Sequence, residues 1–248
     1  MTHGSQDSAS RICHLIGDKN PRAARNVLRY KPSAALLIAL VLAIALLTPG
    51  SAAAAPRNVA ILVWPGAELL DFTGPAEVFA SAGRHRLFKV HTVGFSKEPL
   101  RTQGSVLVVP EFTLADCPKP AVIVVPGGNM NSVTGNREVL DWLKRHSPGA
   151  EVALSVCTGS FLPAEAGLLD GLDATTPPFG WEALARQFPR VRVVRTERFV
   201  DNGKVVTAGG VSAGIDGALH VVEKLHGREA AEWTAREWME YRGYPAKR

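Results

Sequence analysis

The sequence predicts an α/β domain built on a mostly parallel sheet, and three features support this fold class. Apolar runs at residues 58–64, 121–125 and 152–156 have the composition of strands that are buried on both faces. Segments with helical periodicity alternate with these runs along the chain. Pairs of turn residues, among them Pro65-Gly66 and Gly127-Gly128, end the strands abruptly.

The first 55 residues have the layout of a secretory signal peptide. A polar, basic stretch precedes an unbroken apolar run at residues 35–47, and small residues follow at 52–55. This run is shorter than the ~20 residues that span a bilayer as a helix. We therefore expect cleavage after Ala54, export to the periplasm or the medium, and one folded domain over residues 56–248. An uncleaved membrane anchor at residues 35–47 is the alternative.

The leader also accounts for most of the positive charge. The whole chain has a formal net charge of +5, but residues 1–55 carry six Lys and Arg against two Asp. The charge from Pro56 onward is therefore near +1, and a charge so close to neutral does not indicate a nucleic-acid partner. Only Cys117 and Cys157 follow the leader, which is too few for a disulfide framework, and we expect no bridge between them.

The elements of the domain follow from apolar periodicity and turn residues. Short apolar runs predict strands at residues 58–64, 87–95, 121–125, 152–156, 173–176 and 191–194. Amphipathic segments predict helices at residues 73–83, 137–146, 161–167, 181–188, 211–225 and 229–241. Turn residues at Gly104 and at Asn202-Gly203 predict two hairpins, over residues 99–110 and 199–207.

Three residues set the boundaries of the first helix. Thr73 has the character of an N-cap, and Pro75 then lies in the first turn, where its missing N–H costs little. Gly83 ends the helix.

Three strand-to-helix corners bring polar and nucleophilic residues to one edge of the predicted sheet. They lie at residues 64–71, 126–128 and 157–158, each directly after an apolar strand. Sites in parallel sheets form outside the carboxyl ends of the strands, so we expect these corners to meet. Their convergence is the main indication of function.

Cys157 is the predicted nucleophile. It follows the strand at residues 152–156 directly and precedes a helix, which would place its side chain at the tip of a sharp turn. A helix N-terminus favours negative charge, so we expect the pKa of this thiol to be lowered. The alternative is a buried cysteine that acts as a small apolar side chain.

Asp71 and the backbone of the second corner are the predicted partners of this thiol. Asp71 stands among apolar residues, which raise the pKa of a carboxyl group and let it carry a proton; a capping role near Thr73 is the alternative. The N–H groups of Gly128 and Thr158 are candidates for an oxyanion hole, and Gly127 allows the backbone to approach a ligand closely. A simple turn is the alternative for Gly127-Gly128.

Other kinds of site are not indicated. No histidine of the domain stands at one of these corners, and no pair of histidines has the spacing of a metal site. The segment Gly209-Gly210-Val211-Ser212-Ala213-Gly214 lacks the lysine and the glycine order of a phosphate-binding loop. We interpret its glycines as points of close packing between helix and strand.

Five ordered motifs run through the domain: Leu70-Asp71-Phe72-Thr73-Gly74-Pro75, Val125-Pro126-Gly127-Gly128, Ser155-Val156-Cys157-Thr158-Gly159-Ser160, and residues 166–171 and 207–216. Together they resemble the ThiJ/PfpI superfamily, in particular its isonitrile hydratase-like branch and the amidotransferase-like domains of AraC-type regulators. The resemblance extends from about Val59 to Trp238. It implies a flavodoxin-like three-layer sandwich of the class I glutamine amidotransferase type, with a cysteine elbow, usually assembled as a homodimer.

The resemblance also implies an activity on a small-molecule substrate. Enzymes of this branch add water to the carbon of an isonitrile and release an N-substituted formamide, without a cofactor or metal. Cys157 would be the attacking thiol, Asp71 the carboxylate that handles protons, and Thr158 an assisting residue. Relatives usually have a histidine directly after the residues that match Ala174-Thr175-Thr176, whereas this chain has Pro177. That difference weighs against a Cys–His hydrolase and favours a Cys–Asp pair.

Two other functions fit the same residues. A glyoxalase- or deglycase-like enzyme would use a similar thiol and carboxylate on reactive carbonyl compounds. A non-catalytic module of this fold would bind a metabolite or sense oxidants through Cys157. Regulators of this superfamily append a helix-turn-helix domain, and the 21 residues after Gly227 are too few for one, so we expect no nucleic-acid partner.

Overall fold

The computed structural model describes Ser33 and residues 55–245. The predicted signal peptide, and the alternative anchor at residues 35–47, lie outside the described residues except for Ser33 and Ala55. The described residues 55–245 form one compact unit. Within the part of the chain that is described, no helix is both long enough and apolar enough to cross a membrane.

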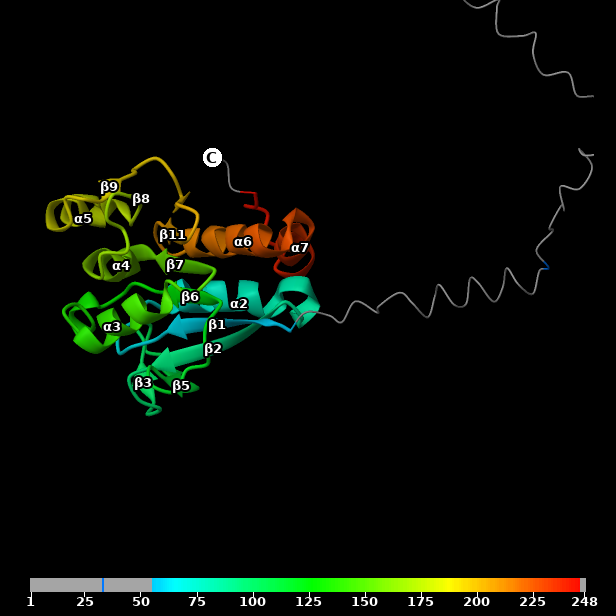
Figure 1. The fold of residues 1–248 in the computed structure, drawn as a ribbon, viewed down its shortest axis with the longest axis horizontal. Helices are drawn as coiled ribbons and strands as arrows, with labels where there is room; N and C mark the ends of the chain where they lie inside the picture. The colour runs from blue at the N-terminus through cyan, green and yellow to red at the C-terminus, as the bar shows by residue number, and fades with distance from the viewer. Residues whose placement is uncertain (1–32, 34–54, 246–248) are drawn as a thin grey trace, which may run out of the picture. The chain divides into compact units, whose positions relative to one another are not determined.

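A seven-stranded sheet forms the middle of this unit (Figure 1). The strands lie in the order β10 (Phe199–Asp201), β11 (Val205–Ala208), β7 (Val152–Val156), β6 (Val122–Val125), β1 (Arg57–Leu62), β2 (Phe88–Gly94) and β5 (Phe112–Thr113). All neighbours run parallel except β10 and β11. The predicted α/β class with a mostly parallel sheet is confirmed.

The connections place helices on both faces of the sheet. α2 (Leu69–His85) leads from β1 to β2, and α3 (Arg137–His146) leads from β6 to β7 in the opposite direction across the sheet. Because such crossovers are right-handed, α2 and α3 lie on opposite faces. α6 (Ala213–His226) lies beside α2, where Gly74 approaches Ile215, and the result is a three-layer sandwich (Figure 1).

The central strands of the sheet lie within the apolar core. Every residue of β6, β7 and β11 is buried, as expected for strands that are covered on both faces. At Gly214 and Gly217 of α6, an added Cβ would come within 2.7 Å of Val156 and 3.0 Å of Leu154. Gly214 of the segment at residues 209–214 therefore does allow close packing of helix on strand, as predicted, whereas a Cβ added at Gly209 or Gly210 would approach no strand; Gly217, outside that segment, provides a second close contact.

The first helix begins earlier than predicted. α2 starts at Leu69 with Glu68 at its N-cap, and Pro75 lies within the helix rather than in its first turn. Thr73 is also inside, where its hydroxyl donates to the carbonyl of Leu69 (2.7 Å). A threonine that bonds the carbonyl four residues back is satisfied within a helix and is not needed as a cap. The regular helix does end before Gly83, which has a φ of +58°.

The smaller elements differ from prediction mainly at their ends. The two predicted hairpins are present, as β3 (Leu100–Arg101) with β4 (Leu107–Val108) and as β10 with β11, although the positive φ in the first turn falls on Ser105. β8 (Asp173–Ala174) pairs in parallel with β9 (Arg192–Val193) outside the main sheet, and α5 (Trp181–Gln187) lies between them in sequence. Elements that were not predicted are β5 and the 3-10 turns η1 (Met130–Ser132) and η3 (Pro178–Gly180). The last predicted helix is shorter: α7 (Arg228–Trp233) passes into a π-helical turn, η4 (Thr234–Trp238).

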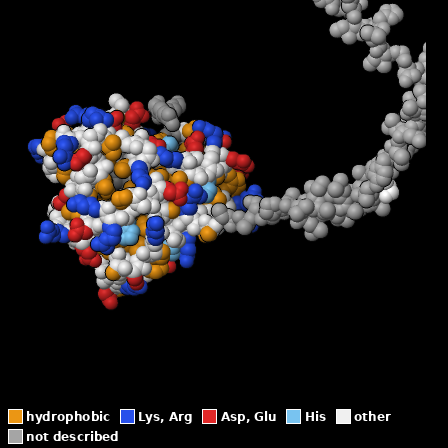
Figure 2. Space-filling model, viewed as in Figure 1, with side chains coloured by type: hydrophobic (Ala, Val, Ile, Leu, Met, Phe, Trp, Pro, Cys, Tyr) orange, Lys and Arg blue, Asp and Glu red, His pale blue; other side chains and the backbone are white. Residues whose placement is uncertain are grey.

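The surface of the domain carries mixed charge on the face that Figure 2 shows. Lys and Arg side chains are interspersed there with Asp and Glu side chains, and no area of a single sign dominates. This agrees with the near-neutral charge of the chain from Pro56 onward.

Candidate active site

The three predicted corners meet at one end of the sheet. β1 and β6 are neighbours whose connections leave in opposite directions, and such a switch point opens a crevice at the carboxyl ends of the strands. Asp71 follows β1, Gly127 follows β6, and Cys157 follows β7, which lies next to β6. The first two corners are joined directly, because the backbone N–H of Glu68 donates to the carbonyl of Gly127 (2.9 Å).

Cys157 stands at a strained turn. Its φ is +58°, in the left-handed region that residues other than glycine seldom occupy, and it opens a four-residue 3-10 turn (η2, Cys157–Ser160). Three hydrogen bonds to the backbone N–H and carbonyl of Cys157 hold this conformation. The N–H of Cys157 donates to the carbonyl of Gly209 (2.6 Å), and its carbonyl accepts the hydroxyls of Ser160 (3.3 Å) and Thr176 (3.1 Å). The turn has the form of the predicted elbow.

Asp71 is wholly buried in the first turn of α2. Its Oδ2 accepts the backbone N–H of Gly127 (3.0 Å), and the carboxyl also interacts with the Cys157 thiol and with the backbone N–H of Val211. Burial raises the pKa of Asp71 from 3.8 to about 6, against the opposing effect of these partners. The raised pKa agrees with the prediction of a carboxyl group that can carry a proton.

The pKa of Cys157 is raised, and the prediction of a lowered value was wrong. Burial is the main cause and the negative charge of Asp71 the second; together they bring the pKa to about 12 despite the N–H and hydroxyl of Thr158. The helix that follows, α4 (Phe161–Glu165), has only five residues and comes after a 3-10 turn. The N-terminus of so short a helix stabilises a thiolate only weakly, so it does little to offset the increase in pKa that burial causes.

The thiol and the carboxyl therefore share one proton at neutral pH. With the pKa of Asp71 at about 6 and that of Cys157 at about 12, the pair loses one proton near pH 6 and keeps the other. Groups that interact so closely titrate as a unit, and the remaining proton can pass from sulfur to oxygen when a substrate arrives. The pair can thus act as a nucleophile and a proton carrier together.

The glycine corner packs tightly against the elbow. A Cβ on Gly127 would lie 2.6 Å from Thr158 Oγ1 and 2.9 Å from Cys157 Cβ. The N–H of Gly127 donates to Asp71, and the N–H of Gly128 donates to Thr158 Oγ1 (3.1 Å). Both donors are thus engaged, whereas the sequence suggested that Gly128 would offer its N–H to a ligand. Thr158 Oγ1 accepts this bond, so the proton of its hydroxyl group points elsewhere. The Thr158 hydroxyl also interacts with the Cys157 sulfur.

Several residues of the site were not found from the sequence. Gly209 and Val211 contribute through backbone groups, and such roles leave no side-chain signal. Glu68, directly before α2, is half-buried, and its charge helps to raise the pKa of Asp71. The available signal for Gly209 and Val211 was the position of their motif directly after a buried strand, β11.

The histidines of the domain lie away from the thiol. His91 contacts Glu111, His220 contacts Asp201, and His226 contacts Arg57. The rings of His85 and His146 lie against those of Trp238 and Trp142. Pro177 stands beside the β11–α6 loop, 3.7 Å from an ideal Cβ on Gly210, and Phe179 is 78% exposed. Among the described residues, no group of three or more His, Cys, Asp or Glu side chains could hold a metal, and Cys117 and Cys157 are both free thiols.

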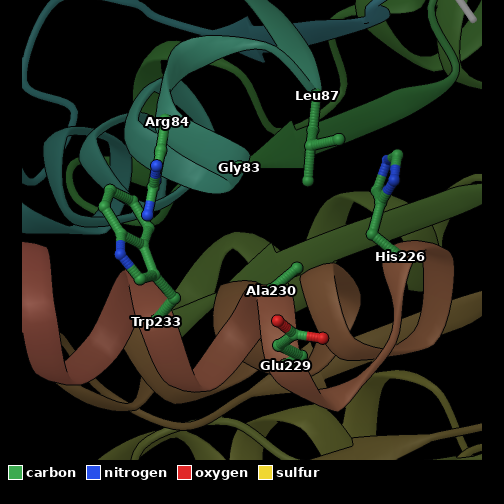
Figure 3. A pocket seen from close by; sticks show the side chains of 7 residues that line it. All are labelled: Gly83, Arg84, Leu87, His226, Glu229, Ala230 and Trp233. Carbon is green, nitrogen blue, oxygen red and sulfur yellow. The ribbon is translucent and has the colours of Figure 1, made fainter. Parts of the chain in front are cut away.

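A cavity of about 410 Å³ lies elsewhere, between the end of α2 and the corner of α6 and α7 (Figure 3). It is lined by Gly83, Arg84, Leu87, His226, Glu229, Ala230 and Trp233. Figure 3 shows Arg84 beside the ring of Trp233, with 5.6 Å between the guanidinium carbon and the ring centroid. Leu87 directly precedes β2, so this cavity lies at the amino ends of the strands, opposite the elbow.

A cysteine elbow and a buried carboxyl group at the switch point of a parallel sheet define a class of cysteine-centred α/β proteins. The chain belongs to the DJ-1/PfpI family, whose sequence model matches residues 57–224. The resemblance seen in the sequence motifs is thereby confirmed, and so is the flavodoxin-like fold that it implied.

The relatives differ in function. Isonitrile hydratase of Pseudomonas putida is 34% identical over 176 residues, which cover 71% of this chain and 75% of that protein. The HTH-type transcriptional regulator GbdR of Pseudomonas aeruginosa is 27% identical over 180 residues, which cover 70% of this chain but only 48% of the regulator. Among solved structures, a THiJ/PfpI family protein from Pseudomonas syringae has a TM-score of 0.69 at 29% identity, covering 77% of this chain and 78% of that one. Drosophila melanogaster DJ-1beta has a TM-score of 0.67 at 25% identity, covering 74% and 98%.

The raised pKa of Asp71 predicts a pH-dependent stability. The folded-state pKa of about 6 lies above the ordinary 3.8, so the folded state holds this proton more tightly than the unfolded state does. The resulting stabilisation is present below pH 3.8 and is lost as the pH rises through 6. The free energy of unfolding of Asp71→Asn relative to the wild type should therefore increase by about 2 kcal/mol between pH 4 and pH 7.

Urea unfolding of both proteins across this pH range measures the difference. The control is Asp116→Asn, because the Lys97 ammonium and Thr113 lower the pKa of that exposed carboxyl to about 2, below the range tested. The difference in the free energy of unfolding between Asp116→Asn and the wild type should stay constant over this pH range. An equally constant difference for Asp71→Asn would show that Asp71 is already ionised at pH 4.

Proposed function

We propose that the protein is a cysteine-dependent isonitrile hydratase, which adds water to the carbon of a small isonitrile and releases an N-substituted formamide. The observation that carries this proposal is the buried pair of Cys157 and Asp71, which shares one proton at neutral pH. Among the described residues, no histidine bonds to either group. Similarity to an isonitrile hydratase over 71% of the chain supports the same chemistry.

The first step joins sulfur to the isonitrile carbon. Asp71 takes the proton of the Cys157 thiol as the sulfur attacks, and it then gives this proton to the same carbon. A C–S bond and a C–H bond form, and the product is a thioimidate, R–N=CH–S–Cys157. No charge is created overall, which suits a buried site.

The second step releases the product. Asp71 accepts a proton from a water molecule that attacks the thioimidate carbon and passes this proton to the nitrogen, which gives the tetrahedral intermediate R–NH–CH(OH)–S–Cys157. The C–S bond then breaks to give R–NH–CHO, and Asp71 transfers the proton of the intermediate's hydroxyl group to sulfur. The N–H and the hydroxyl of Thr158 interact with the Cys157 sulfur and stabilise the negative charge that develops as it leaves. Gly128 orients that hydroxyl through its N–H, and Gly127 orients Asp71.

Turnover of an isonitrile tests this function. The purified protein is incubated with cyclohexyl isonitrile in ¹⁸O-labelled water, and N-cyclohexylformamide is measured by mass spectrometry. We expect protein-dependent formamide that carries one ¹⁸O atom, and none with heat-denatured protein. A parallel incubation with methylglyoxal measures the glyoxalase- or deglycase-like alternative, and consumption of methylglyoxal alone would replace the hydratase proposal with that one.

A second candidate function is a non-catalytic module that binds a small ligand or reacts with oxidants. The high pKa of Cys157 favours it, because little thiolate is present at neutral pH. The similarity to GbdR, of which this chain covers about half, is compatible with such a role. Absence of turnover with both substrates, together with saturable ligand binding or oxidation of Cys157 detected by mass spectrometry, would favour the module over the enzyme.

Export and self-assembly are further proposals. The layout of residues 1–55 supports export to the periplasm or the medium, and the anchor at residues 35–47 remains the alternative. Three exposed apolar side chains around the β3–β4 hairpin, Val106, Leu107 and Val109, support an interface with a second copy of the chain. The intact mass of the exported protein should equal that of a chain beginning at Ala55. Light scattering should report twice the mass of this cleaved chain.

A further inference from the structure

An ionic cluster around the buried carboxylate of Asp216 lies next to the loop that follows β11. Asp216, in the first turn of α6, is 1% exposed. One of its oxygens accepts from Arg198 Nε (2.5 Å) and the other from the Tyr241 hydroxyl (2.8 Å). Arg198 also donates to Ser212 Oγ (3.2 Å). Burial and Asp216 raise the pKa of Tyr241 to about 12, so its hydroxyl remains a donor throughout the neutral range.

The same loop, residues 209–212, is bonded on its other side to the proposed catalytic pair. The N–H of Gly209 donates to the carbonyl of Arg198 (2.8 Å), while the carbonyl of Gly209 accepts the N–H of Cys157 (2.6 Å). The backbone N–H of Val211 interacts with the Asp71 carboxyl. Four residues thus connect the ionic cluster with both members of the pair.

The conformation of this loop is strained. Val211 has a φ of +41°, which is an outlier for a β-branched residue, and it is 39% exposed, so burial of its own side chain does not hold it there. The bonds from Arg198 to Gly209 and Ser212, and from Arg198 to Asp216 on the helix that follows, fix the loop on both sides of Val211.

We propose that Arg198, Asp216 and Tyr241 form a clasp that positions the Cys157–Asp71 pair through the loop at residues 209–212. When the side-chain bonds of the clasp are lost, Val211 relaxes and its N–H moves away from Asp71, while the bond between Cys157 and Gly209 is then supported by the main-chain carbonyl of Arg198 alone. The three clasp residues are positioning residues. They touch neither the sulfur nor the Asp71 carboxyl among the contacts described.

The rate of alkylation of Cys157 by iodoacetamide, measured against pH, tests the clasp. The groups that face Asp71 are the Cys157 thiol, the N–H groups of Gly127 and Val211, and the charge of Glu68. Displacement of the Val211 N–H weakens an interaction that favours the ionised carboxyl, so the inflection that belongs to Asp71 should move upward by about half a pH unit in Arg198→Ala and Asp216→Asn. Tyr241→Phe and Arg198→Lys, which each keep part of the clasp, should show smaller upward shifts.

Peptide mass spectrometry follows Cys157 alone, so other thiols do not interfere. The control is Arg190→Ala, which breaks an exposed ion pair with Asp170 (2.6 Å) away from the loop and should leave the inflection unchanged. If Arg198→Ala and Tyr241→Phe lower the melting temperature but leave the inflection where it is, the cluster is merely structural and the proposal is overturned. If Arg198→Ala does not fold, the inflections of Tyr241→Phe and Ser212→Ala test the proposal instead. Each of these variants removes one hydrogen bond, to Asp216 and to Arg198 respectively.

Alkylation requires no substrate turnover. The clasp can therefore be upheld or rejected whether or not the protein hydrates isonitriles.

Discussion

Replacing Cys157 with alanine should lower kcat/KM for isonitrile hydration by about a thousandfold or more, because no sulfur remains to bond the substrate carbon. Formamide production under steady-state conditions gives kcat and KM separately, and we expect the loss in kcat. Cys117→Ser is the control. Cys117 is half-buried, and its thiol donates to the carbonyl of Pro118 (3.3 Å) rather than to any residue of the site. That variant should stay within about twofold of the wild type.

A second substitution at the same position separates catalysis from folding. Cys157→Gly should be as inactive as the alanine variant, yet more stable by about 1 kcal/mol, because glycine adopts a φ of +58° without strain. Urea unfolding measures this gain. Substantial hydration by either variant would mean that Asp71 activates water without a covalent intermediate, and the thioimidate mechanism would be wrong.

Gly128→Ala should have the largest effect on stability. Its φ is +119°, and a Cβ would lie 2.3 Å from the carbonyl oxygen of Gly66 and 2.5 Å from the backbone nitrogen of Glu68. Backbone atoms of a tight corner cannot move aside as a flexible side chain can. We expect a loss of about 3 kcal/mol in the free energy of unfolding, with loss of the bond to Thr158 and of activity.

Gly135→Ala is the matched control for this substitution. Gly135 also has a positive φ, +72°, but an added Cβ would meet nothing within 4 Å. It should therefore lose only about 1 kcal/mol, the backbone contribution alone, and should keep its activity. Equal losses in the two variants would show that the corner at Gly128 rearranges, and that the close contact with Gly66 is not important for stability.

The parts of the fold that the sequence predicts best are those with a continuous apolar pattern. β7 and α3 have the expected bounds, 152–156 and 137–146, because a fully buried strand and a strongly amphipathic helix leave clear patterns. β5 has only two residues at the edge of the sheet, and no pattern can be detected over that length. The start of α2 was misplaced because Thr73 resembles a cap but bonds within the helix.

The sequence predicted those residues of the site whose positions follow from the topology of the sheet. Asp71, Gly127 and Cys157 follow three strands of one parallel sheet, and the carboxyl ends of such strands meet. The contributions of Gly209 and Val211 come from backbone atoms that every residue has, so the identity of these residues did not reveal them. The pKa of Cys157 depends on how deeply the thiol is buried and on its proximity to Asp71, and neither quantity can be obtained from residue order.

The switch point between β1 and β6 also bears on how this protein could acquire new substrates. The pair at its centre is held by the main-chain N–H of Gly127, which donates to Asp71, and by the main-chain carbonyl of Gly209, which accepts from Cys157; substitutions of exposed side chains elsewhere leave these bonds intact. Exposed positions such as Phe179 can therefore vary without breaking these bonds. A library restricted to such exposed positions would leave the geometry of the pair intact, which makes this scaffold suitable for directed evolution.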